Sequence, residues 1–173
     1  HRTLHCICLL GLALLMASPA LRGGEEAKWK ALLAAYKEVR RSEDAQKRAG
    51  VLARFARHEN AESVGILLEH LLEDPAPQAR NTAAKALASF TSDATVDQLA
   101  KRAKQNVRDP LRWRLLLLVL GAIDNPDKTL PALLELAGGR DEELAILATD
   151  ALGRARQPTP AVLQQLTALT GEE

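Results

Sequence analysis

Residues 74–88 read DPAPQARNTAAKALA, a proline-rich turn followed by a run of alanine and leucine. Aspartate followed by proline favours a helix start, because the carboxylate accepts from free backbone amides and proline has no amide hydrogen to satisfy. Alanine and leucine have high intrinsic helix propensity, whereas strands favour β-branched and aromatic residues. The stretch therefore predicts a turn and then a helix that carries Leu87 near its end.

The end of this stretch returns along the chain at a nearly constant spacing. A leucine followed by alanine or glycine recurs in steps of 35, 33 and 32 residues, at Leu52, Leu87, Leu120 and Leu152. A second apolar register lies between these positions in steps of 32, 34 and 32 residues, at Val64, Val96, Leu130 and Val162. Two interleaved registers with one period predict two helices per repeat. We expect helices over 25–41, 44–58, 61–73, 77–90, 93–105, 110–123, 128–137, 141–155 and 159–169.

The unit at 74–88 resembles the second helix of a HEAT-like repeat, and most closely the short form found in phycobilisome-lyase-type HEAT proteins. Leu144, Ala148 and Leu152 repeat its spacing. The resemblance implies an all-α fold, an α-solenoid of stacked antiparallel helix hairpins, with about four helix pairs and a terminal helix over 21–173. It also implies the family's role in protein–protein interaction.

The resemblance further implies a ladder of aspartate–arginine pairs between repeats. We expect a single pair, Asp74 with Arg80, because Trp113 stands where the pattern has arginine. The unit near Ala45 is likewise expected to lack the arginine. A tetratricopeptide array is the main alternative fold, since the segment 29–36 resembles the opening of that motif, but no later unit repeats its aromatic residues.

Composition narrows the class of protein. The chain is 47% hydrophobic and only 3% aromatic, which disfavours a β-rich fold. It has 23 basic residues against 22 acidic ones, and this balance argues against a protein whose main partner is a polyanion.

The first 20 residues predict a signal peptide. Arg2 precedes an apolar run over 6–17, and Ser18 and Ala20 occupy the −3 and −1 positions of a cleavage site after Ala20. The apolar run is shorter than a membrane span, and we expect Pro19 and the segment 22–24 to break it. The mature chain is then secreted or periplasmic, with no cysteine and no membrane span. An uncleaved anchor is the alternative.

Residues suited to catalysis are sparse after position 20. The histidines there are His58 and His70. The pair His58-Glu59 does not predict a metal site, because one pair in a turn cannot supply a ligand set. His70 is expected at the surface beside a core face. No phosphate loop or nucleophile motif occurs, so we predict a protein that is not an enzyme and needs no cofactor or metal.

A basic cluster extends from the end of the fifth predicted helix through the turn after it and into the sixth, and consists of Lys101, Arg102, Lys104, Arg108 and Arg112. It is a third functional possibility, binding of nucleic acid or another polyanion. The neutral chain, the predicted export and the lack of an aromatic platform favour ordinary solvated cations at a helix end.

The repeat register also predicts a face for a protein partner on the second helix of each pair. One row contains Gln46, Asn81, Arg114 and Ile146, and the next contains Gly50, Lys85, Leu118 and Asp150. Apolar residues beside arginine are typical of interface anchors, so Arg114, Leu118, Ile146 and Lys85 are the candidate binding residues. The alternative is that neighbouring repeats partly cover both rows. We predict an exported, non-catalytic interaction scaffold, with an accessory or lyase-like enzyme subunit as the alternative.

Overall fold

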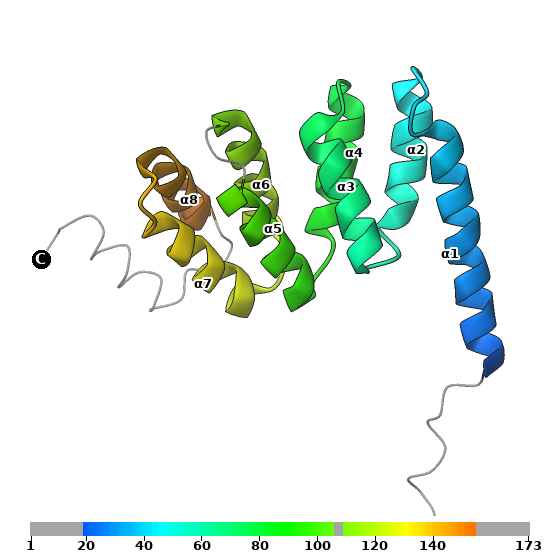
Figure 1. The fold of residues 1–173 in the computed structure, drawn as a ribbon. Helices are drawn as coiled ribbons and strands as arrows, with labels where there is room; N and C mark the ends of the chain where they lie inside the picture. Colours follow the sequence, from blue (N-terminus) through cyan, green and yellow to red (C-terminus); the bar gives the residue numbers. More distant parts are fainter. Residues whose placement is uncertain (1–18, 106–108, 155–173) are drawn as a thin grey trace, which may run out of the picture.

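The computed structural model describes residues 19–105 and 109–154, and every regular element within these ranges is an α-helix. The eight helices stack side by side in chain order, from α1 at one end to α7 and α8 at the other (Figure 1). Their bounds are α1 Pro19–Val39, α2 Ala45–Phe55, α3 Ala61–Glu73, α4 Pro77–Ala88, α5 Asp93–Gln105, α6 Pro110–Ala122, α7 Pro126–Ala137 and α8 Glu142–Arg154.

The predicted all-α stack of hairpins is confirmed, with one error at its start. We expected the first helix to begin at residue 25, but it begins at Pro19 and runs through the glycines at 23 and 24. Proline is tolerated at the first position of a helix, and a glycine inside a helix costs about 1 kcal/mol without ending it. The signal segment 1–18 and the predicted helix 159–169 lie outside the described residues.

The helix starts follow the predicted local chemistry. The Asp44 carboxylate accepts from the amides of Gln46 at 2.9 Å and Lys47 at 3.1 Å, and caps α2. Asp109 caps α6 in the same way and is followed by proline at the first helical position. These caps satisfy amides that have no partner within the helix, so α2 and α6 each begin at a residue that the sequence specifies.

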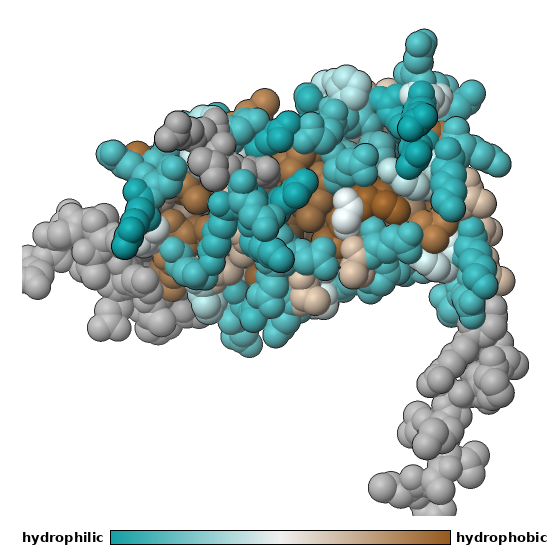
Figure 2. All heavy atoms as spheres, in the orientation of Figure 1, coloured by the Kyte–Doolittle hydropathy of each residue, from teal (hydrophilic) through white to brown (hydrophobic). Residues whose placement is uncertain are grey.

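The hairpins pack in two layers. The second helices form one layer, in which α2 packs on α4 and α6 packs on both α4 and α8. The first helices form the other, with α5 between α3 and α7. On the face that Figure 2 shows, hydrophobic residues lie between the helices along the middle of the stack, and hydrophilic residues cover its edges. The core therefore runs continuously between the layers.

The repeated leucines form this core. Leu52, Leu87, Leu120 and Leu152 are each at most 1% exposed. Gly121, the small residue that follows Leu120, lets α6 lie close to α8, since a Cβ at Gly121 would lie 3.4 Å from the Ala151 carbonyl oxygen on α8. None of the helices within 19–105 and 109–154 has the length and apolar character needed to span a bilayer.

The loops between hairpins are joined by hydrogen bonds across the repeats. The Glu59 carboxylate, in the loop before α3, accepts from the amides of Thr91 at 3.2 Å and Ser92 at 2.8 Å. It also accepts from the Thr95 hydroxyl at 2.8 Å. One repeat further on, Asn125 donates to the Thr91 carbonyl at 2.7 Å. Three successive loops are thereby tied together at one edge of the stack.

Candidate functional site

The second-helix layer presents the two predicted rows to solvent. Counted from the start of α4, α6 and α8, the fifth residues are Asn81, Arg114 and Ile146, and the ninth are Lys85, Leu118 and Asp150. All six are exposed, as are Gln46 and Gly50 on α2. Neighbouring repeats therefore do not bury these positions.

Two large apolar side chains stand out on this face. Leu118 is 54% exposed and Ile146 is 62% exposed, although the residues beside Leu118 on both sides are buried. A third exposed apolar residue, Leu111 at 63%, lies one turn before Arg114 and was missed in the sequence. It falls three residues before the predicted row, so the same register could have found it. We call the exposed surface of α2, α4, α6 and α8 the second-helix face.

A buried polar network lies at the α1–α4 end of the stack. The Asp74 carboxylate accepts from Nε and Nη2 of Arg48, at 2.9 and 2.7 Å, and from Nδ1 of His70 at 2.8 Å. It also accepts from the Ala76 amide at 2.9 Å. On the other side of the imidazole, Nε2 lies 3.2 Å from the Tyr36 hydroxyl. The network therefore joins α1, α2 and α3 to the turn that precedes α4.

The placement of His70 corrects the sequence analysis. We expected His70 at the surface, but it is only 7% exposed. Its ring packs edge-on against Tyr36, with the ring centroids 5.7 Å apart. Polar partners on both ring nitrogens offset the cost of removing the imidazole from water, because each hydrogen bond within the protein replaces one to water.

Electrostatics fix the charge state at the centre of the network. Burial alone would raise the pKa of Asp74, but the Arg48 guanidinium, the Ala76 amide and His70 together lower it to about 2. An ionised carboxylate can only accept, so Nδ1 of His70 donates to Asp74.

The family described as HEAT repeats matches residues 31–118, which is 88 of the 173 residues. The chain belongs to the HEAT-repeat family. No curated protein and no solved structure matches it significantly. The HEAT assignment covers α2–α5, the C-terminal part of α1 from residue 31 and most of α6, and it decides against the tetratricopeptide alternative.

The aspartate–arginine pair of this HEAT-repeat chain differs from the expected one. Arg80 donates to the backbone carbonyl of Asp74 at 3.2 Å, and the carboxylate is held by Arg48 instead. Arg48 also donates to the carbonyl of Ser42, six residues earlier, just as Arg80 does to Asp74. The unit near Ala45 therefore does contain the arginine, contrary to our expectation, and that arginine reaches into the next repeat.

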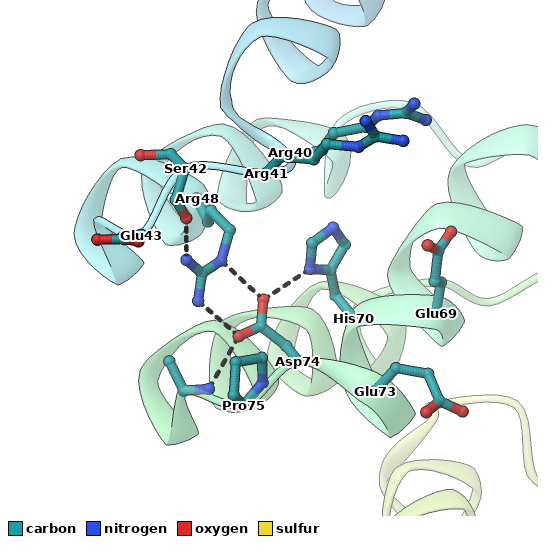
Figure 3. Close-up of a pocket in the computed structure, with 11 residues that line it drawn as sticks. Arg40, Arg41, Ser42, Glu43, Arg48, Glu69, His70, Glu73, Asp74 and Pro75 are labelled. Atoms are coloured by element: carbon teal, nitrogen blue, oxygen red, sulfur yellow. Dashed lines mark hydrogen bonds and ion pairs between the residues drawn. The ribbon is translucent and has the colours of Figure 1, made fainter.

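An open cleft of about 600 Å³ lies over this network in the HEAT stack. Arg40 and Arg41 line it on the α1 side, and Glu69 and Glu73 line it on the α3 side (Figure 3). The imidazole of His70 has both nitrogens engaged, so it offers no free base to a molecule in the cleft. Within the described ranges no set of three histidine, cysteine or acidic residues is arranged to hold a metal ion. The network acts as a structural tie between two repeats.

Two residues of the basic cluster in the HEAT stack form ion pairs with acidic residues of other helices. Lys104 pairs with Glu135 on α7 at 2.6 Å, and Arg112 pairs with Glu73 on α3 at 2.8 Å. Lys101 and Arg102 are exposed on α5, in the first-helix layer, and Arg108 lies outside the described residues. Part of the cluster is thus neutralised by neighbouring repeats.

Proposed function

We propose that this HEAT-repeat chain is a non-catalytic scaffold that binds a protein partner on its second-helix face. One observation carries the proposal: Leu118 and Ile146 are more than half exposed on adjacent helices, and Arg114 lies one turn before Leu118. Apolar and arginine anchors of this kind dominate the energetics of protein interfaces. HEAT repeats generally serve as interaction scaffolds, which supports the proposal.

A double substitution, Leu118→Glu with Ile146→Glu, tests this function. Both side chains are exposed, so helicity by circular dichroism and the melting temperature should stay near the wild-type values. Co-purification of partners from the native host should be lost. The matched control, Ala27→Glu with Ala31→Glu, places the same two charges on exposed positions of α1. Unchanged co-purification by the Leu118/Ile146 variant would refute the binding face.

We further propose that the scaffold acts outside the cytoplasm, after cleavage following Ala20. The order of basic, apolar and small residues over 1–20 supports export. Mass spectrometry of the exported protein should find a chain that begins at Leu21. A cytoplasmic product that retains Met16 would contradict this localisation.

A lyase-like accessory subunit is the alternative, and it rests on the resemblance of residues 74–88 to phycobilisome-lyase-type repeats. A chromophore bound to the purified protein would favour it. The ion pairs of Lys104 and Arg112 argue against the third possibility, polyanion binding by the basic cluster.

A further inference from the structure

Charge is segregated between the helices of this nearly neutral chain. The helices α2, α4 and α6 contain no aspartate or glutamate, and their basic residues are Lys47, Arg48, Arg54, Arg80, Lys85, Arg112 and Arg114. In contrast, α3 contains Glu62, Glu69 and Glu73 and no lysine or arginine. Since the whole chain has 23 basic and 22 acidic residues, this distribution cannot follow from composition.

Three of these cations are available on the second-helix face. Arg54, Lys85 and Arg114 are exposed, and none of them forms an ion pair with another residue in the part of the chain that the structure describes. Arg48 and Arg112, by contrast, are held by Asp74 and Glu73. The free cations are therefore not needed to balance charge within the fold.

The cations alternate in space with the exposed apolar residues. Lys85 and Leu118 are both ninth residues, on the adjacent helices α4 and α6. Arg114 and Ile146 are both fifth residues, on the adjacent helices α6 and α8. Neighbouring packed helices lie about 8–10 Å apart. A single bound segment could therefore contact both an exposed apolar residue and the cation on the adjacent helix.

We infer that the second-helix face binds an acidic, amphipathic protein segment. Its carboxylates would pair with Arg54, Lys85 and Arg114, while its apolar side chains cover Leu118 and Ile146. The inference rests on the proposed function, and it adds the chemistry and direction of the partner. Asp150 and Glu143 are exposed on α8, so the acidic end of the segment lies toward α2 and α4, and the apolar end lies over α6 and α8.

This combination favours a protein over other anionic partners. Nucleic acid gains its affinity from many phosphate contacts and from aromatic stacking, whereas this face offers three free cations and three large aliphatic side chains, those of Leu111, Leu118 and Ile146. A membrane surface would need a broad apolar face, whereas Leu118 and Ile146 stand among polar residues. Electrostatic complementarity with an acidic segment would also set which partner is selected.

A designed peptide provides the direct probe. A helical peptide of about 20 residues is about 30 Å long, which spans three packed helices. One face of this peptide carries glutamate toward one end and leucine toward the other end, and a companion peptide carries lysine in place of glutamate. Fluorescence anisotropy with the full chain should detect binding of the glutamate peptide only, and this binding should weaken when the Debye length falls to about 3 Å in about 1 M salt.

Substitutions then locate the site. Lys85→Glu with Arg114→Glu should weaken binding of the glutamate peptide about tenfold or more, because two attractive pairs become repulsive. The matched control is Lys101→Glu with Arg102→Glu, the same charge change on exposed positions of α5, and it should change the affinity less than about twofold. Circular dichroism and melting verify that both variants remain folded.

Several outcomes would overturn the inference. One is an equal loss of affinity for the glutamate peptide in the control variant Lys101→Glu with Arg102→Glu. Another is that the lysine peptide binds as tightly as the glutamate peptide. A third is that a DNA duplex or phosphatidylglycerol vesicles bind more tightly than the glutamate peptide. Self-association or capture of the chain's own segment 159–169 by this face would also refute it. A host partner could lose binding to the Leu118/Ile146 variant but bind the Lys85→Glu with Arg114→Glu variant as well as the wild type. That result would support the scaffold function and refute an acidic partner.

Discussion

The guanidinium of Arg48 on α2 holds the carboxylate of Asp74 after α3 through two parallel hydrogen bonds, of 2.9 and 2.7 Å. The two residues are 26 positions apart and belong to successive hairpins. Both are almost fully buried, at 6% and 5% exposure. The pair therefore fixes how the first repeat stacks on the second, and its energetics can be tested separately from binding.

Loss of the Asp74 charge should destabilise the stack strongly. Asp74→Asn leaves the buried Arg48 guanidinium without its counter-charge, and removal of one partner of a buried pair costs about 3–5 kcal/mol. The matched control, Asp150→Asn, breaks an exposed pair with Arg154 and should cost less than about 1 kcal/mol. Urea denaturation followed by circular dichroism measures both. Similar losses for the two variants would show that the buried pair is not a structural tie.

The same pair predicts a dependence of stability on pH. The pKa of Asp74 is about 2 in the folded chain against an ordinary value of 3.8. A carboxyl with a lowered pKa contributes stability above the unfolded pKa, and this contribution is lost as the pH falls through the folded pKa. The free energy of unfolding should therefore fall by about 2 kcal/mol when Asp74 becomes protonated.

Unfolding free energies of the wild type and Asp74→Asn, measured in parallel from about pH 5 to about pH 2, test this dependence. The gap between the two proteins should be constant above about pH 5 and should narrow on acidification. A constant gap down to pH 2 would mean that Asp74 titrates with an ordinary pKa.

The repeated leucine register predicts where the core is sensitive. Leu87 is fully buried, so Leu87→Ala should cost about 2–5 kcal/mol. Lys85, two residues earlier, is exposed on the second-helix face, and Lys85→Ala should cost well under 1 kcal/mol. Thermal and urea unfolding compare the two variants. Equal costs would show that the register is wrong.

The loop contacts of Glu59 should contribute less to the free energy of unfolding than the Arg48–Asp74 pair or Leu87 does. Hydrogen bonds from Ser92, Thr95 and Thr91 lower the pKa of Glu59 against the raising effect of its partial burial, so the carboxylate form is the one that the loop stabilises. Glu59→Ala should cost about 1 kcal/mol. The control Glu38→Ala removes an exposed carboxylate for which no contact is seen among the described residues, and it should be nearly neutral. No difference between the two would argue against the tie between loops.

Much of the fold could be predicted because the signals for helix starts and for buried helix faces lie within short stretches of sequence. Proline and aspartate mark the helix starts, and the leucine–small pairs mark the buried face of every second helix. The exposed positions followed from the same period, since Leu118 lies two residues before the buried Leu120 and Ile146 lies six residues before the buried Leu152.

The polar contacts between repeats could not be predicted in this way. His70 looks like a surface residue from its neighbours in the sequence, and its burial depends on Tyr36, which lies 34 residues earlier. Nothing in the sequence around Glu59 indicates that its carboxylate accepts hydrogen bonds from a loop 32 to 36 residues later. Such partners are set by the stacking of hairpins, which a local pattern does not encode.

Site-specific photo-crosslinking at position 118 is the most direct test of the central claim. A photoreactive amino acid replaces Leu118 in the full chain, and a second chain carries it at Arg102 on α5. After irradiation in the native host, we expect position 118 to form a crosslink to another protein and position 102 to form none with that protein. Crosslinks from position 118 only to its own chain, or the same partner captured through position 102, would contradict a binding role for the second-helix face.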